Sequence, residues 1–368
     1  MKDSSQRPLF FAVSTAFFPY IGGAEIALEE VVSRLPAYDR VVVTARMSRK
    51  LARREEYRGV SIIRIGFGFA GDKFLLPFGV IWHAWKNSRK RERVVLMSVM
   101  VSYGTLGVLL VSRFLKQSRM YIWLQEGDSE AHLTRGKFGL IGLGWRIVLP
   151  HVRVGALSAS LAARARAHGA RDIVIIPNGV EVSLFARDEK LQTLHKPLVL
   201  VTASRLVSKN GVRDIIESLV HMPTVRLIIA GDGPDRFMLE QKAQHVKVDT
   251  RIEWLGSVSH QELAKVFHRA QVFVRPSRSE GLGNAFLEAM AAGLVVLAPM
   301  VGGIPDFFRP EENGIEIISH DPVSIVRAVE RIEHDDVLAK RLIRGGYETV
   351  KDYDWSRIVH TFSSWIAN

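Results

Sequence analysis

The chain of 368 residues contains no cysteine. This absence excludes a disulfide framework, a thiolate metal site and a catalytic thiol, and it is typical of proteins that work in a reducing compartment. The sequence enters a strand-like apolar segment, Leu9 to Val13, without the apolar length of a signal peptide. We therefore expect a cytoplasmic protein.

Long hydrophobic runs are scarce, and the longest extends from Val94 to Val111. At about 18 residues it is at the lower limit for crossing a bilayer. It contains Ser98, Ser102, Gly104 and Gly107, and its first half has the composition of a buried strand that precedes a helix. We therefore favour a strand and a helix over a membrane span.

Acidic residues are fewer than basic ones, 38 against 50, which gives a formal net charge of +12. The basic residues are dispersed apart from clusters at 49–54 and 86–93, and no nucleic-acid-binding motif accompanies them. We therefore expect no nucleic-acid partner. An anionic donor nucleotide and an anionic membrane leaflet account for the charge more economically.

The sequence also argues against a metal site and against a dinucleotide-binding site. The twelve histidines show no ligand pairing at helical or hairpin spacing, so we expect no metal site. The segment Gly66 to Gly71 has the Gly-x-Gly-x-x-Gly spelling of a dinucleotide site, but it lacks both a convincing helix after it and the acidic residue about 20 positions further on.

The length exceeds what one hydrophobic core usually supports, so we expect two domains. Short apolar runs alternate with helical patterns, which predicts parallel sheets with helices on both faces. In the first half the expected strands are Phe10–Ser14, Val41–Thr44, Ser61–Ile65, Val94–Ser98, Tyr121–Leu124, Val154–Ser158 and Ile173–Ile176. After the polar stretch 187–196 they are Leu198–Thr202, Leu227–Ala230, Ile252–Leu255, Val272–Val274, Val295–Ala298 and Ile315–Ile318. We therefore predict two doubly wound α/β domains, 1–188 and 189–350, whose ligands bind beyond the carboxyl ends of the strands.

The most informative motif is a pair of carboxylates, Glu280 and Glu288, separated by seven residues. Between them, Gly281 and Gly283 precede a helix rich in Ala, Leu and Met. The unpaired N–H groups of a helix N-terminus can receive a phosphate, and glycine lets the backbone approach it closely. The two carboxylates are suited to binding hydroxyl groups. Together these features indicate a nucleotide sugar.

This motif and its surroundings, up to Gly302-Gly303-Ile304-Pro305-Asp306, resemble the Glu-x7-Glu region of the GT4 family of retaining glycosyltransferases, which have the GT-B fold. The resemblance extends over nearly the whole chain. Its other landmarks are Phe18–Glu25, Ile176–Val180, Ser204–Gly211, Gly231–Pro234 and Tyr353–Arg357. It implies two Rossmann-like domains that face a central cleft, with the first domain on the acceptor side, the second binding the nucleotide sugar, and a C-terminal helix, 351–368, crossing back to the first domain.

The resemblance implies a role for each matching residue. Glu288 would accept hydrogen bonds from the donor ribose, and Glu280 would lie beside the transferred sugar. Arg205 and Lys209 would hold the diphosphate in place of a metal ion, although the family lysine usually stands directly before the glycine, where this chain has Asn210. The catalytic candidates are thus Glu280, Arg205 and Lys209. The donor-binding candidates are Gly22, Gly23, Arg205, Lys209, Glu280, Gly281, Leu282, Gly283, Asn284 and Glu288.

One landmark departs from the family pattern. Gln125 stands where many members have a histidine, and Asp128 matches a common later acid. The resemblance therefore implies no proton carrier at this position, and Gln125, Asp128 and Asn178 are candidates for sugar or acceptor contacts.

We predict a retaining, metal-independent hexosyltransferase that needs no cofactor and moves a sugar from a nucleoside-diphosphate sugar to a glycan, a lipid-linked molecule or another hydroxyl acceptor. Two alternatives stay open. One is a sugar-nucleotide epimerase of similar architecture, and the other is a non-catalytic basic protein that binds membranes or nucleic acid.

The segment Phe67 to Arg93 combines aromatic and aliphatic residues with Lys and Arg. This composition is suited to an anionic membrane surface and favours peripheral attachment at the cytoplasmic face. The alternative is a helix that packs only on its own domain.

Overall fold

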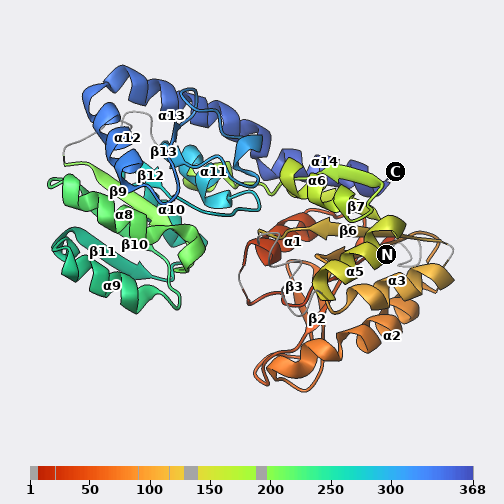
Figure 1. Cartoon of the computed structure of the whole chain (residues 1–368). Helices are drawn as coiled ribbons and strands as arrows, with labels where there is room; N and C mark the ends of the chain where they lie inside the picture. The colour runs from red at the N-terminus through yellow and green to blue at the C-terminus, as the bar shows by residue number, and fades with distance from the viewer. Residues whose placement is uncertain are drawn as a thin grey trace. The chain divides into compact units, whose positions relative to one another are not determined.

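The computed structural model describes residues 7–20, 22–89, 91–115, 117–127, 140–187 and 197–367. The chain divides into two compact α/β units, one formed by Met1–Pro177 with Ile358–Asn368 and the other by Asn178–Arg357 (Figure 1). The expected boundary between 188 and 189 falls outside the described residues. In the structure the second unit begins earlier than expected, at Asn178. It ends after Arg357, which is seven positions later than the expected end at residue 350.

The first unit is built on an eight-stranded sheet with the order β3-β4-β2-β1-β5-β6-β7-β8. Its neighbouring strands are parallel except β3 and β4, which are antiparallel. The strands are β1 Leu9–Val13, β2 Asp39–Ala45, β3 Arg54–Tyr57, β4 Val60–Ile65, β5 Val94–Val99, β6 Ser118–Leu124, β7 Arg153–Ala156 and β8 Asp172–Ile175. Each strand expected in this half is present, whereas β3 was not expected.

Strand β3 escapes sequence analysis because its residues, Arg-Glu-Glu-Tyr, carry no apolar alternation. It is an edge strand that pairs with β4. The fully buried guanidinium of Arg64 on β4 donates to the Glu55 carboxylate of β3 at 2.6 Å and to the Phe18 carbonyl at 2.6 Å. A buried arginine needs such partners, so this ion pair fixes an otherwise polar strand to the sheet edge.

The first-unit helices are α1 Gly23–Ser33, α2 Leu76–Ser88, α3 Thr105–Phe114, α5 Leu140–Val148, α6 Ala159–Ala167 and most of α14 Trp355–Ala367. In Figure 1, α14 lies on one side of the sheet and α2 with α3 on the other. Phe362 of α14 packs against Phe10 of β1 and Trp123 of β6, so the C-terminal helix belongs to the first-unit core. The apolar stretch 94–111 forms β5 and part of α3, as expected, and no helix among the described residues is long and apolar enough to cross a membrane.

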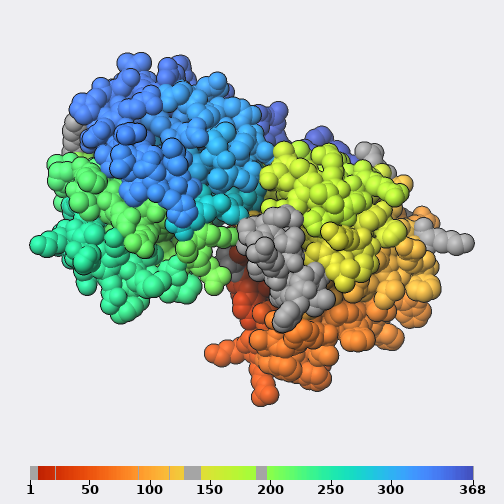
Figure 2. Space-filling view, viewed as in Figure 1, coloured from red at the N-terminus to blue at the C-terminus, as the bar shows by residue number. Residues whose placement is uncertain are grey.

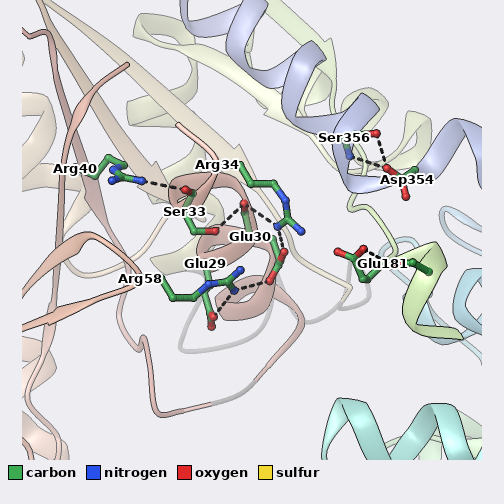
Figure 3. Close-up of polar contacts among 10 residues, drawn as sticks. Glu29, Glu30, Ser33, Arg34, Arg40, Arg58, Glu181, Asp354 and Ser356 are labelled. Atoms are coloured by element: carbon green, nitrogen blue, oxygen red, sulfur yellow. Dashed lines mark hydrogen bonds and ion pairs between the residues drawn. The ribbon is translucent and has the colours of Figure 1, made fainter. Parts of the chain in front are cut away.

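Helix α1 is fastened at its C-terminal half by charged contacts (Figure 3). Arg58, in the turn between β3 and β4, lies 2.9 Å from carboxylate oxygens of both Glu29 and Glu30. Arg40 of β2 donates to the Ser33 carbonyl at 2.9 Å. These contacts hold the C-terminal half of α1 to the neighbouring strands of the first unit.

The second unit is built on a six-stranded, fully parallel sheet with the order β11-β10-β9-β12-β13-β14. Its strands are β9 Val199–Ala203, β10 Arg226–Ala230, β11 Ile252–Gly256, β12 Val272–Val274, β13 Val295–Ala298 and β14 Ile315–Glu316, which confirms the strands expected there. Its helices are α7 Val182–Phe185, α8 Val212–Ser218, α9 Arg236–His245, α10 His260–Phe267, α11 Asn284–Ala291, α12 Pro322–His334 and α13 Asp336–Val350.

The short helix α7 explains why the second unit begins before residue 188. Phe185 is fully buried and packs against Phe267 of α10, with 5.9 Å between the ring centroids. Val180 forms a bridge with Asp354, and a Cβ on Gly179 would lie 2.6 Å from the Trp355 ring. Segment 178–187 therefore packs on the second unit through Phe185, Val180 and Gly179 rather than forming a linker.

Candidate active site

The strand order of the second unit reverses between β9 and β12, since the chain proceeds outward through β10 and β11 and then returns to pair β12 with β9. Open parallel sheets bind ligands beyond the carboxyl ends of the strands at such a reversal. The loop after β9 carries Arg205 and Lys209, and the loop after β12 carries Glu280. The predicted catalytic residues therefore lie on the two loops where this rule expects a ligand.

These two loops are in direct contact. The amide of Arg278 donates to the Lys209 carbonyl at 2.7 Å, and the Arg278 side chain donates to the Ser208 carbonyl at 2.6 Å. Gly211 has φ +70, and a Cβ there would lie 2.3 Å from the Pro276 carbonyl oxygen, so only glycine permits this approach. The structure thus brings the predicted diphosphate-binding loop and the predicted sugar-binding loop together.

The cations of the first loop point toward solvent. Arg205 and Lys209 are exposed, whereas Asn210, which stands where the family pattern has lysine, is buried. The Asn210 amide donates to the Arg205 carbonyl at 2.7 Å and so braces the loop from inside. Lys209 rather than residue 210 therefore presents the charge.

Glu280 is held by two neighbours. Arg275, which is 7% exposed, forms an ion pair with its Oε1 atom, and the Ser277 hydroxyl donates to the same oxygen at 2.7 Å. Arg275 also donates to the Ala203 carbonyl at 3.1 Å and lies over the Phe286 ring. One oxygen of the Glu280 carboxylate, Oε1, is therefore held by two neighbours.

Helix α11 begins beside Glu280. Its N-cap is Gly283, with φ +89, and no side chain among the described residues caps its first turn. Leu282 is buried and anchors the loop, whereas Asn284, the first residue of the helix, is partly exposed. Gly281 is partly exposed, and the loop is backed by Gly302, where a Cβ would lie 2.0 Å from the Glu280 carbonyl oxygen. This is the uncapped helix N-terminus that the sequence predicted.

Glu288 lies one helical turn further along α11 and is 9% exposed. Its Oε1 atom lies 2.9 Å from Nε2 of His260, the first residue of α10. Burial disfavours the charged imidazolium, but the hydrogen bond and the charge of Glu288, with the charge of Glu181, together raise the pKa of His260. The carboxylate that the family resemblance assigns to the donor ribose is thus oriented by a histidine that sequence analysis did not single out.

The remaining predicted residues lie elsewhere. Gly22 and Gly23 open helix α1 of the first unit, and a Cβ on Gly22 would lie 2.3 Å from Oε2 of Glu25. Burial raises the pKa of Glu25, against a lowering by its own backbone amide. A carboxylate therefore already lies at this helix N-terminus, where an anion is favoured.

Gln125 follows β6 and is buried, as Asn178 is at the start of the second unit. Asp128 lies outside the described residues. Next to Gln125, burial raises the pKa of Glu126 to about 7, although three amides, those of Glu126, Val101 and Gln125, donate to its carboxylate and oppose the rise. A carboxyl group that titrates near neutrality therefore stands one position after the place of the family histidine.

The glycine-rich segment 66–71 has a structural role. Gly66 and Gly68 have φ +113 and +97, and the amides of Phe67, Gly68 and Phe69 all donate to the Asp72 carboxylate. Burial alone would raise the pKa of Asp72, but these hydrogen bonds lower it. The anion-binding amides are occupied by the chain's own carboxylate, which agrees with the exclusion of a dinucleotide site.

Sequence reasoning missed Arg275 and His260. A signal for Arg275 was present, because it interrupts the apolar run Val272-Phe273-Val274 and a charged residue at the end of a buried strand needs a partner. His260 carries no local signal, since its partner is 28 positions away. Among the described residues, no group of three or more His, Cys, Asp or Glu side chains is placed to hold a metal ion.

Residues 186–349 match the family profile described as Glycosyl transferases group 1. The chain is 33% identical over 155 residues to the phosphatidylinositol N-acetylglucosaminyltransferase gpi3 subunit of Schizosaccharomyces pombe, which is 39% of this chain and 34% of that protein. It is 34% identical over 162 residues to the lipopolysaccharide core biosynthesis glycosyltransferase LpsE of Rhizobium meliloti, which is 44% of this chain and 47% of that protein. The chain thus spans between about a third and a half of the length of these relatives.

Solved structures match almost the whole chain. Sucrose-phosphate synthase from Thermosynechococcus elongatus has a TM-score of 0.85 at 19% identity and covers 97% of this chain and 98% of its own. Anabaena HepE, solved in complex with UDP and glucose, has a TM-score of 0.77 at 16% identity, with 98% and 100% covered. The profile match lies within the second unit and the structural matches include both units. We conclude that the chain has the GT-B fold and that its second unit contains a domain that matches the group 1 glycosyltransferases over residues 186–349.

Proposed function

We propose that the protein transfers a sugar from a nucleoside-diphosphate sugar to a hydroxyl acceptor, with retention of the anomeric configuration and without a metal ion. The observation that carries the proposal is the contact between the Arg205–Lys209 loop and the Glu280–Glu288 region at the strand-order reversal of the second unit. It combines exposed cations and an uncapped helix N-terminus, which suit a diphosphate, with the buried Glu288 and the partly buried Glu280, whose carboxylates suit a polyol.

The donor would be bound mainly by the second unit. Arg205, Lys209 and the first amides of α11 would bind the diphosphate, and Glu288 would accept from the ribose. His260 already holds Oε1 of Glu288, and among the described residues no second partner engages Oε2. A uridine nucleotide is the first donor to test, because Anabaena HepE was solved with UDP and with UDP-glucose.

Chemistry would follow from charge placement. As the glycosidic bond to the phosphate breaks, negative charge develops on the leaving diphosphate, where Arg205 and Lys209 stabilise it. The acceptor hydroxyl would attack from the same face, and the departing phosphate oxygen would take its proton. Glu280, whose Oε1 is neutralised by Arg275, would position sugar hydroxyls through Oε2 rather than act as a nucleophile.

The acceptor would be a hydroxyl of a glycan or of a lipid-linked molecule, reached in the cytoplasm or at the cytoplasmic face of a membrane. This acceptor class is supported by two relatives, whose names contain phosphatidylinositol and lipopolysaccharide respectively.

Thermal-shift titration with a panel of nucleoside diphosphates and their sugars tests the donor, because a ligand that binds the folded state raises its apparent stability. We expect one nucleoside diphosphate to bind equally with and without chelator, and the Arg205→Met/Lys209→Met variant to lose that binding. The exposed pair Arg327→Met/Lys265→Met on the same unit is the matched control. Strict dependence on magnesium, or equal loss in both variants, would contradict the proposal, and conversion of the donor without an acceptor would indicate an epimerase instead.

A further inference from the structure

Helix α2 has two apolar faces. Leu76, Val80, Ala84 and Ser88 are buried at a spacing of four residues and face the first-unit core. Its exposed residues are Phe78, Trp82, Trp85 and Lys86, and Phe78 is 73% and Trp82 59% exposed. An ordinary surface helix has polar residues on its outer face, so these side chains form an outward apolar stripe that core packing does not explain.

Helix α3 repeats this arrangement. Its exposed residues are Leu106, Leu110, Arg113 and Phe114, again near a four-residue spacing, and Phe114 is 82% exposed. The opposite side of the helix, with Val108 and Val111, is buried. Each residue that either helix exposes is thus Phe, Trp, Leu, Lys or Arg.

The two stripes belong to one surface. A Cβ on Gly107 of α3 would lie 2.7 Å from the Pro77 carbonyl oxygen and 3.2 Å from Val80 of α2, so the two helix backbones are in close contact. The helices lie side by side in Figure 1, and in Figure 2 the atoms of this part of the chain, in orange, lie on the visible surface. We call the exposed residues of α2 and α3, with Phe74, Lys73 and Arg89, the α2–α3 face.

The α2–α3 face is positively charged. Between Asp72 and Glu126 the sequence contains a single acidic residue, Glu92, and Asp72 itself is buried against backbone amides. Arg89 lies over the Trp85 ring at 5.0 Å, and Lys73 lies over the Phe74 ring at 5.4 Å. Cations that rest on aromatic rings at an apolar surface match the boundary between lipid headgroups and acyl chains.

Some basic residues of the 86–93 cluster do not belong to the α2–α3 face. Arg91 forms an ion pair with Asp39 at 2.6 Å, and Arg93 donates to the Ile366 carbonyl at 3.2 Å, so these two side chains fasten the fold. Lys90 lies outside the described residues. The cations of the face are therefore Lys73, Lys86, Arg89 and Arg113.

We propose that the α2–α3 face binds an anionic phospholipid bilayer, with the aromatic and leucine side chains in the headgroup boundary and the four cations on the lipid phosphates. Charge decides the occupant. A second copy related by two-fold symmetry would place this positive face against itself, whereas an anionic leaflet attracts each cation and also accepts the apolar stripe. The inference rests on the proposed function only in that a chain held there would meet lipid-linked acceptors.

Vesicle co-sedimentation of the full chain tests the proposal without donor or acceptor. We expect binding to vesicles of phosphatidylcholine with phosphatidylglycerol, little binding to phosphatidylcholine alone, and weakening by salt, because screening shortens the reach of the charges. The Lys86→Gln/Arg89→Gln/Arg113→Gln variant should bind roughly a hundredfold more weakly, since each cation near such a surface contributes about one factor of five. The Phe78→Ser/Trp82→Ser/Phe114→Ser variant should also bind more weakly. Its residual binding should depend on charge and should therefore disappear at high salt.

A control variant carries comparable changes on exposed residues of the second unit: Phe237→Ser, Met238→Ser, Lys265→Gln and Lys340→Gln. We expect it to bind vesicles like the native chain. All variants should keep nucleoside-diphosphate binding, which reports the second unit, and a native circular dichroism spectrum, which reports folding. The proposal would be overturned by equal binding to neutral and anionic vesicles or by an equal loss of binding in the control variant. It would also be overturned if the native chain formed concentration-dependent dimers that the variants of the α2–α3 face abolish. If the native chain binds no nucleoside diphosphate, the proposed function is refuted but this inference is not.

Discussion

Nε2 of His260 and Oε1 of Glu288 lie 2.9 Å apart and join the first residue of α10 to the middle of α11. Glu288 is nearly buried, and a buried carboxylate without a partner would be costly. His260 also contacts the Phe185 ring, with 5.0 Å between ring centroids, so three helices of the second unit meet at this pair. The pair fixes which oxygen of Glu288 can serve a ligand.

This pair predicts a pH-dependent stability. Because the pKa of His260 is raised in the folded state, its contribution is fully present below about pH 6.5, the unfolded value, and is lost as the pH rises through the higher folded value. We expect the native chain to lose more stability between pH 6 and pH 8.5 than His260→Gln does, measured as urea midpoints. His245→Gln, which changes an exposed histidine of the same unit, should behave like the native chain. Parallel pH profiles for the native chain and His260→Gln would refute the role of the pair.

Glu126 gives a second pH prediction, in the first unit. Its folded pKa of about 7 lies above the ordinary value of 4.5, so the folded chain binds more protons than the unfolded chain between these values. Stability should therefore fall as the pH rises from 4.5 to 7, because ionisation of the buried group is costly. Glu126→Gln should remove this part of the pH dependence and melt higher than the native chain at pH 8. A lower melting temperature for Glu126→Gln at pH 8 would show that the carboxylate is stabilising instead.

Arg275 and Glu280 should be coupled. Arg275→Met removes the cation that compensates a nearly buried carboxylate, which typically costs about 3 to 5 kcal/mol of folding free energy. Glu280→Gln in the same chain removes the uncompensated charge, so the double variant should regain part of the loss. A double-mutant cycle measured by denaturant unfolding gives the coupling. Additive effects would mean that the two side chains do not depend on each other.

The strands could be predicted because buried parallel strands are continuous apolar runs, as in Val94–Val99 and Val295–Ala298. The boundary of the second unit could not be predicted, because α7 is anchored by the contact of Phe185 with Phe267, which lies about 80 positions away in the sequence. Strand β3 likewise depends on a contact, from Arg64 to Glu55, that has no local pattern.

The site divides in the same way. Gly283 could be predicted from sequence because the chain needs φ +89 where the loop enters α11. The assignment of Lys209 to the diphosphate, one position before the braced Asn210, stays a prediction. Arg275 and His260 could not be assigned, since their partners are set by packing of α10, α11 and the loop after β12. Motif spacing locates the two glutamates, whereas the neighbours that set their charge and orientation are determined by the tertiary structure.

The two glutamates should respond differently to substitution. Glu288→Ala should weaken donor binding by about tenfold to a hundredfold, the loss of one charge-assisted hydrogen bond, whereas Glu280→Ala should chiefly lower turnover. The structure adds a complication, because alanine also leaves His260 or Arg275 without its partner. Glutamine retains an oxygen that can accept from each neighbour, so Glu288→Gln and Glu280→Gln isolate the ligand contacts.

Calorimetry with the nucleoside diphosphate found by thermal shift, together with steady-state kinetics on its sugar, measures both effects. We expect Glu288→Gln to raise the dissociation constant with a small change in kcat, and Glu280→Gln to lower kcat with nearly native binding of the nucleoside diphosphate, which lacks the sugar. Glu330→Ala on the exposed side of α12 should match the native chain in both measurements. A residue that binds the ground state changes affinity, whereas one that contacts the reacting sugar changes the rate. Small and equal effects of the two glutamine variants would therefore show that neither carboxylate contacts the donor.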